Sequence, residues 1–349
     1  MMRGRLVIVA AVIATLAGFV FLRGPTPDIK VKPETLTSFG IVNVTNTMIT
    51  SWIVVAFIVV AVFLATRRWE LVPRGVQNLL EAIIDAFYNL VVNVAGEKNG
   101  RRFFPVVATI FFFVLVANWL SLLPIFNVIG MGKAEDHGFV QEQVDVGPLP
   151  VTFVPLSSLD QLKGRSIDEE DPQAEEKAAQ ERGEGNFVGE ILPLFRGVNT
   201  DLNTPLALAI VSAIAVESWG IASLGFRTYG AKFFNVGRLL RGLVRFKLGE
   251  VFQGGIDAFV GFLEFVSEAV RLVSFTFRLF GNMFAGEILI LVFTFIVPLI
   301  FVLPFYFLEL FVGVIQAFIF AMLTLVFGVM AVTHAESHTA EPVPAATSE

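Results

Sequence analysis

The stretch FFPVVATIFFFVLVANWLSLL, at Phe103–Leu123, decides the fold. It holds no charged residue in 21 positions, and Arg101 and Arg102 stand directly before it. A helix needs about 20 predominantly apolar residues to cross the hydrocarbon core of a bilayer. The stretch therefore predicts a membrane-spanning helix that is entered from a basic side.

The composition of the whole chain agrees with this first segment. Of its 349 residues 55% are hydrophobic and 16% are charged, and the mean hydropathy is +0.74. Soluble chains average about 45–50% apolar and about 25% charged residues, so we predict a polytopic membrane protein. The chain has no Cys and three His, which excludes disulfides and thiolate metal sites. We expect neither a metal nor a cofactor.

Four further segments are long and apolar enough to span, and they are Met48–Ala65, Leu206–Phe226, Gly255–Val297 and Leu299–Thr333. A helix of about forty residues is about 60 Å long, against a hydrocarbon core of about 30 Å. The last two helices must therefore be long and strongly tilted.

The segment Gln77–Ala95 has a different pattern. Its apolar residues recur at helical spacing, with Glu81, Asp85 and Asn89 opposite them. This pattern predicts an amphipathic helix lying in the membrane interface. The fold class is then an all-α polytopic membrane protein with five core transmembrane helices and one interfacial helix.

The N-terminus adds one more apolar segment, Leu6–Leu22, which follows Arg3 and Arg5. Its 17 residues fit both a signal peptide and a retained anchor, and we keep both alternatives for residues 1–24. Either one places residues 25–47 outside the cytoplasm.

Basic residues predict the topology. The connections Arg67–Arg102 and Arg227–Lys247 each carry six Lys or Arg, so both should face the cytoplasm. The segment Gly130–Thr200 holds fourteen Asp or Glu and six Lys or Arg, and we place it on the other side. We interpret it as a solvated spacer without chemistry, with a linker-like centre at Ile167–Gly185. The acidic charge also argues against nucleic acid as a partner.

These segments divide the chain into regions. Residues 48–129 hold the first two spans and the interfacial helix, and residues 130–200 form the acidic extracytoplasmic loop. Residues 201–335 form a three-helix core, and residues 336–349 form a cytoplasmic tail.

Five polar residues recur at helical spacing in the penultimate segment, and they are Glu264, Glu268, Arg271, Arg278 and Asn282. The spacing places all five on one helical face. Arg278 has apolar flanks and no nearby helix end from which to reach water. A mid-bilayer Arg costs from about 3 to about 17 kcal/mol, so we expect it to have a function. For Glu264, Glu268 and Arg271 two alternatives stay open, an ordinary salt bridge near the cytoplasmic end and a step of a proton path.

Counting outward from Pro298 predicts which residues of the last two helices lie at the same depth. Arg278 should face Gln316, and Glu287 should face Glu309 nearer the outer surface. Arg278 then has no counter-ion at its own depth, so a carboxylate on another protein is its natural partner. Acidic residues on both sides of a fixed cation are the layout of an interrupted proton path.

Three sequence segments resemble a known family. FRLFGNMFAGE (Phe277–Glu287) and IQAFIFAMLTLVF (Ile315–Phe327) are similar to the signature segments of subunit a of the F-type ATP synthase membrane sector. TDLNTPLAL (Thr200–Leu208) resembles a third, weaker segment. The resemblance is specific from about Thr200 onward and only architectural over Met48–Leu123.

The resemblance implies a stator proton channel of a rotary ATP synthase. It implies that Arg278 faces the ring of c subunits, that Asn282 and Gln316 line its neighbourhood, and that Glu287 and Glu309 belong to the outer half-channel. The partners would be the c ring, the peripheral-stalk b subunits, the rest of the complex and membrane lipid. The location would be a bacterial cell (inner) membrane, with the C-terminus in the cytoplasm.

Other readings of the residues stay open beside this one. Glu217 lies well inside its own span and is expected to be functional, in a role that the sequence does not define. The chain has no HExxH, P-loop or GxSxG pattern, so we expect no catalysis by this chain alone. The alternative function is a stand-alone proton-coupled transporter or ion channel. The choice of H⁺ or Na⁺ stays open because the ion-binding carboxylate would lie on the partner.

Overall fold

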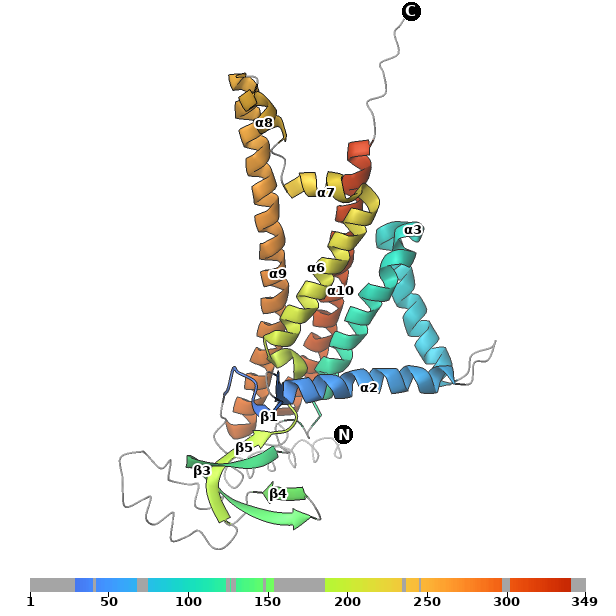
Figure 1. Ribbon diagram of the computed structural model, residues 1–349. Helices are drawn as coiled ribbons and strands as arrows, with labels where there is room; N and C mark the ends of the chain where they lie inside the picture. The colour runs from blue at the N-terminus through green and yellow to red at the C-terminus, as the bar shows by residue number, and fades with distance from the viewer. Residues whose placement is uncertain are drawn as a thin grey trace, which may run out of the picture. The chain divides into compact units, whose positions relative to one another are not determined.

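The computed structural model describes residues 29–39, 42–67, 75–123, 126, 130–146, 149–153, 186–233, 237–244, 246–296 and 302–339. Its helices are α2 (Asn46–Thr66), α3 (Val76–Ser121), α6 (Asn203–Leu224), α7 (Phe226–Phe233), α8 (Gly237–Val244), α9 (Leu248–Ile296) and α10 (Leu303–Thr339). A 3-10 turn, η1, covers Val198–Thr200. The strands are β1 (Thr35–Phe39), β2 (Val42–Thr45), β3 (Gly130–Val146), β4 (Leu149–Phe153) and β5 (Asn186–Pro193). Figure 1 shows these elements.

Five helices of the described chain are long and apolar enough to cross a membrane, namely α2, α3, α6, α9 and α10. They overlap all five spans that the sequence predicted, which confirms the all-α polytopic fold class. α9 has 49 residues, or about 73 Å of helix, which is more than twice the thickness of a bilayer core of about 30 Å. Its strong tilt stays a prediction. α10 continues to Thr339, four residues into the predicted tail. The apolar segment Leu6–Leu22 lies outside the described residues.

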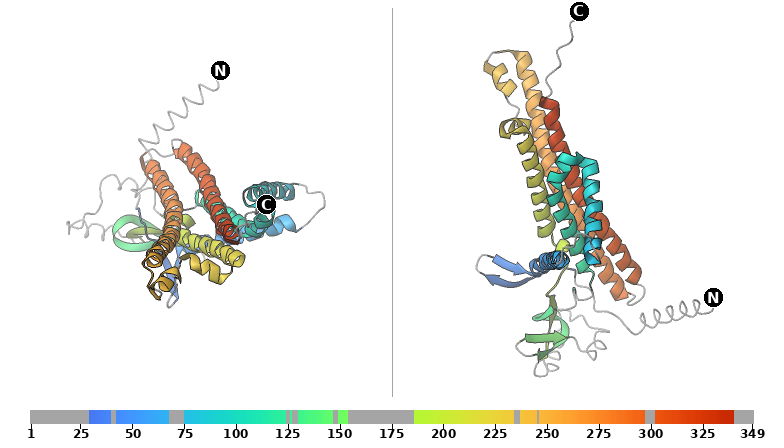
Figure 2. Two further views of the ribbon diagram at one scale, coloured as in Figure 1. Left: turned by 90° about the horizontal axis from the view of Figure 1, so that it is seen from above. Right: turned by 90° about the vertical axis from the view of Figure 1, so that its right-hand side faces the viewer.

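The predicted amphipathic segment and the second span belong to one helix, α3, which is broken at Gly96 (φ 75°, ψ 162°). Its two arms fold back on each other (Figures 1 and 2). The Phe87 and Phe111 rings stack at 4.5 Å, and Tyr88 meets Phe104 edge-on at 5.1 Å. The amphipathic segment thus packs part of its apolar face on the chain itself. Its place in the membrane interface stays a prediction.

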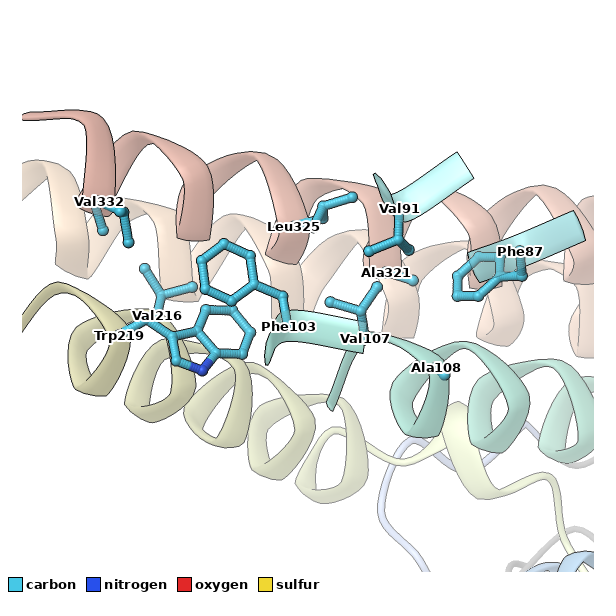
Figure 3. Packing of buried hydrophobic residues seen from close by; sticks show 11 residues of the cluster. Phe87, Val91, Phe103, Val107, Ala108, Val216, Trp219, Ala321, Leu325 and Val332 are labelled. Carbon is cyan, nitrogen blue, oxygen red and sulfur yellow. The ribbon is translucent and has the colours of Figure 1, made fainter. Parts of the chain in front are cut away.

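The described residues fall into two compact units, and each is described by itself. The second unit, from residues 58–115, 202–281 and 314–339, has a core built by α3, α6 and α10 (Figure 3). Phe103 stacks on Trp219 with ring centroids 4.1 Å apart. A Cβ at Gly328 would lie 2.7 Å from the Trp219 ring, so the glycine permits this close approach of α10 to α6. Figure 3 shows the packed side chains, which are Phe87, Val91, Phe103, Val107, Ala108, Val216, Trp219, Ala321, Leu325, Ala331 and Val332.

The first unit, from residues 29–57, 116–201 and 282–313, contains the strands. β1 and β2 form an antiparallel hairpin, and β3 pairs antiparallel with β4 on one side and β5 on the other. The start of α2, directly after the hairpin, is tied to β5 and to the residue after η1, because Asn46 Nδ2 donates to the Pro193 carbonyl (3.1 Å) and Thr47 Oγ1 to Asp201 Oδ2 (3.0 Å). The sequence did not predict these strands. The linker-like centre, Ile167–Gly185, lies outside the described residues.

Candidate functional site

α9 and α10 run antiparallel, and contacts within each unit give their register. In the first unit the Phe293 and Phe305 rings stack at 4.0 Å, and in the second unit Phe275 meets Phe320 at 5.0 Å. This register is close to the one that counting from Pro298 predicted.

Arg278 lies on α9 with its side chain exposed. Its guanidinium Nη2 donates a weak hydrogen bond of 3.4 Å to Ser274 Oγ on the same helix. Exposed apolar side chains surround it on α9, among them Val270, Val273 and Phe277. Among the described residues no acidic group forms an ion pair with Arg278. A guanidinium keeps its proton under all ordinary conditions, so this is a fixed positive charge on an outward apolar face.

Two neutral polar side chains were predicted beside Arg278. Gln316, on α10, is buried with 1% of its surface exposed. Asn282 is exposed on α9, one turn after Arg278. The Gln316 amide is therefore buried in the second unit, whereas the Asn282 amide lies on the exposed side of α9.

Glu287 is joined to an arginine that the sequence did not single out. Arg196 Nη2 lies 3.5 Å from Glu287 Oε2, and the two side chains are 6% and 12% exposed. Nη2 of the same arginine donates to the Lys30 carbonyl (2.6 Å) and Nη1 to the Lys32 carbonyl (3.3 Å). The backbone of residues 30–32 thus holds the guanidinium in place beside Glu287.

Arg196 lies in the acidic segment that we interpreted as a solvated spacer. That interpretation fails for its last residues, since Arg196, Val198, Asn199 and Thr200 are buried. Their position directly before or at the start of the TDLNTPLAL segment was the available sequence signal, but the acidic composition of the preceding residues obscured it.

Glu309 is also buried, with 8% of its surface exposed. Its carboxylate occupies the space above Gly286, where a Cβ would overlap it. Glu287 and Glu309 were predicted to lie at one depth. The Glu309 carboxylate packs on Gly286 of α9, and Glu287 is the next residue of the same helix. Both belong to the first unit.

Hydrogen bonds hold α10 beside this region. Asn118 Nδ2 donates to the Gly313 carbonyl (3.2 Å), and Trp119 Nε1 donates to the Leu310 carbonyl (3.3 Å). Asn199 Nδ2 in turn donates to Asn118 Oδ1 (2.7 Å). Asn118 therefore links α3, η1 and α10, a role typical of amides between membrane helices.

The second unit contains the remaining acidic candidates. Arg271 Nη1 binds both carboxylate oxygens of Glu268, at 2.9 and 3.1 Å, and its guanidinium carbon lies 3.8 Å from the Phe327 ring centre. This is the salt bridge that we left open as one alternative. Glu264 is half-buried one turn earlier.

Glu217, on α6, lies against Tyr229 of the short helix α7. The Tyr229 ring is buried and packs on Gly220, where a Cβ would overlap it. Burial, and then the neighbouring Glu217 carboxyl, raise the pKa of the Tyr229 hydroxyl above its ordinary value. The charges of Glu268 and Arg271 act on the same hydroxyl, so α6, α7 and α9 bring these polar groups close together.

The described residues contain no group of three or more His, Asp or Glu placed to hold a metal ion. What they contain is buried carboxylates and amides within apolar spans. Ionisable residues inside membrane segments mark ion or proton pathways. Fold and site therefore define a polytopic membrane protein with ionisable groups along α9 and α10.

Comparison with known proteins narrows this class. Residues 48–328 match the family model described as ATP synthase A chain. The chain is 26% identical to the ATP synthase subunit a of Moorella thermoacetica, over 85% of this chain and 95% of that protein. It is 27% identical to the subunit a of Gloeobacter violaceus, over 80% of each chain. The chain belongs to the ATP synthase A chain family.

Proposed function

We propose that this chain is the stator proton-channel subunit of a rotary F-type ATP synthase in a bacterial cell (inner) membrane. It offers two offset half-channels to carboxylates on a rotating ring of c subunits, and Arg278 separates the two. It catalyses no reaction alone, and it works with the peripheral-stalk b subunits and the rest of the complex. Its C-terminus lies in the cytoplasm.

The exposed position of Arg278 is the observation that carries the proposal. A permanent charge facing lipid is costly, and the intramolecular contact that it makes is a 3.4 Å hydrogen bond to a hydroxyl. A carboxylate presented by a partner in the membrane would remove this cost. The apolar side chains around Arg278 suit such a partner, because they would pack against its helices.

The outer half-channel runs past Glu309 and Glu287. Both carboxylates are largely buried. Glu309 packs on Gly286, and Glu287 follows this glycine in α9. A proton that passes them neutralises a rotor carboxylate, which then turns into the lipid. Neutralisation is required because an ionised carboxylate is expensive in hydrocarbon.

The inner half-channel uses Glu217, Glu264 and Glu268, with Asn282 and Gln316 beside the arginine. A rotor site that arrives protonated loses its proton here. An adjacent cation favours the ionised form of a carboxylate, so Arg278 assists this release. Because the guanidinium does not give up its proton, it also prevents a direct leak between the half-channels.

The membrane potential supplies the driving force. Each charge that crosses gains about 2.3 kcal/mol per 100 mV. Several protons per turn are therefore needed to drive synthesis.

Purification and reconstitution test the proposal against the stand-alone alternative. A tagged chain should co-purify with a small two-helix proteolipid, and inverted vesicles should acidify when ATP is added. The chain purified without partners and reconstituted in liposomes should conduct no protons. Autonomous proton or solute flux from the isolated chain would contradict the proposal and favour a transporter or channel.

A further inference from the structure

α8 and the first turns of α9 form a tight helical hairpin (Figure 1). A Cβ at Gly242 would lie 2.7 Å from the Val251 nitrogen, so the two backbones touch. Between them Phe246 has a positive φ of 54°, and the Lys247 amide donates to the Gly242 carbonyl at 3.1 Å. The hairpin is thus a defined structure with a fixed turn.

The hairpin presents a group of large apolar side chains on its surface. Val244, Phe246 and Leu248 are 80%, 95% and 87% exposed. Three more exposed apolar residues belong to the same hairpin, namely Leu240, Leu243 and Phe252. We call these six residues the apolar tip. A group of exposed apolar side chains close together in one hairpin indicates an interaction with a partner or a membrane.

The charge around the apolar tip is net positive, because residues 237–257 contain four Lys or Arg and two acidic residues, Glu250 and Asp257. Residues 226–247 contain six Lys or Arg and no Asp or Glu. Arg241 is exposed, and its Nε donates to the Gly237 carbonyl of its own helix (3.1 Å). Arg238 and Lys247 form surface ion pairs with Asp257 and Glu250 at 3.1 and 3.4 Å. Apolar side chains bordered by cations are the composition of helices that lie on anionic membranes.

The connections of the hairpin keep it near a membrane. α6, a spanning helix, ends at Leu224, and α7 begins at Phe226. α9 is itself a spanning helix, and its length of about 73 Å exceeds the bilayer core more than twofold. The early turns of α9 therefore extend beyond the core or along its surface.

We propose that the α8–α9 hairpin binds the anionic lipid surface on the cytoplasmic side of the membrane. The apolar tip enters the boundary between headgroups and acyl chains, and Arg241 and its neighbouring cations contact lipid phosphates. This contact would anchor the N-terminal end of the helix that carries Arg278. The inference does not depend on the proton path.

The absence of Cys from the sequence allows a direct test with one introduced thiol. Val244→Cys is labelled with an environment-sensitive fluorophore in the tagged full chain, purified with its accompanying subunits. The sample is placed in nanodiscs of phosphatidylcholine alone or with phosphatidylglycerol. Brominated lipid and aqueous iodide then report whether lipid or water reaches the probe.

Phosphatidylglycerol should increase quenching by brominated lipid and reduce quenching by iodide. Each cation near an anionic surface contributes a factor of about five to the ratio of lipid-bound to free probe, so Arg241→Gln should lower this bound-to-free ratio by up to that factor. Phe246→Ser should lower the bound-to-free ratio in both lipids. Lys98→Gln removes the same charge from another exposed position and should leave the ratio unchanged.

Two results would overturn the proposal. Equally strong iodide quenching in both lipids, without quenching by brominated lipid, would show that the apolar tip stays in water. Protection from both quenchers would show that a protein partner covers it instead.

Discussion

Arg196 and Glu287 form the most deeply buried ion pair among the residues that the structure describes. Removing one partner of a buried pair leaves a charge without compensation, which typically costs about 3–5 kcal/mol. The two backbone carbonyls from residues 30 and 32 would also lose their donor. The pair is therefore both a stability element and a part of the proposed outer half-channel.

We predict that Arg196→Gln lowers ATP-driven proton pumping at least tenfold and lowers the thermal unfolding temperature. Arg196→Lys keeps the charge and should retain a larger share of both. Arg238→Gln is the matched control, because its ion pair is exposed (53%) and exposed pairs contribute about 0–1 kcal/mol. Parent-like pumping and stability of Arg196→Gln would contradict the assignment.

Gly286 leaves room for the Glu309 carboxylate on the facing helix. We predict that Gly286→Ala displaces this carboxylate, with a cost of about 1–3 kcal/mol in unfolding free energy and a loss of proton flux. Gly255→Ala lies on the same helix with open space at its Cβ position, so it should cost nothing. Proton flux is measured in vesicles that contain each variant. Equal proton flux in Gly286→Ala and Gly255→Ala would show that the space at Gly286 is unimportant.

At the scale of elements, the break in α3 determines where the amphipathic segment packs. Gly96 has a φ of +75° and nothing within 4 Å of its Cβ position. Its requirement for glycine is therefore one of backbone conformation and not of packing. The break allows the first arm to return along the second and to bury Phe87 and Val91 in the core.

Gly96→Ala should destabilise the fold by about 1–3 kcal/mol, because its φ of 75° and ψ of 162° are a backbone conformation that is essentially restricted to glycine. Gly249→Ala is the control, because that glycine has open space and lies in α9 without a positive φ. It should be neutral or stabilising by up to about 1 kcal/mol. Thermal unfolding in detergent measures both, and an unaffected Gly96→Ala would mean that α3 can bend without a residue of positive φ.

The contact of α7 with α6 has a consequence for pH. The raised pKa of Tyr229 means that the folded protein keeps this proton at a pH where the unfolded chain, with an ordinary pKa of about 10, loses it. Folding stability should therefore fall as the pH rises above about 10. Tyr229→Phe should show a smaller fall between about pH 9 and pH 11 in denaturation experiments. The same fall in parent and variant would contradict the proposed burial of this hydroxyl.

At the scale of the whole molecule, the sequence was sufficient to predict the features that depend on residues close together along the chain. The five spans follow from apolar runs such as Phe103–Leu123, and the α9–α10 register follows from counting outward from Pro298. The salt bridge Glu268–Arg271 follows from a spacing of three residues on a helix. Each of these depends on neighbours along the chain or on a single hairpin.

The features that escaped prediction depend on distant contacts or on single backbone angles. Arg196 and Glu287 are 91 positions apart in sequence, and no periodic pattern in the sequence predicts such a pair. The pairing of β3 with β5 brings together segments on either side of residues 154–185. The break at Gly96 needs one positive φ, and many glycines in this chain have none.

One measurement tests the central claim, which is that Arg278 is the fixed charge between two half-channels. ATP-driven acidification of inverted vesicles is compared for the parent and for Arg278→Gln, with assembly of the complex checked by co-purification. The account predicts that the variant assembles and that its pumping is abolished. An assembled variant that pumps at the parent rate would contradict it and leave Arg278 with a structural role only.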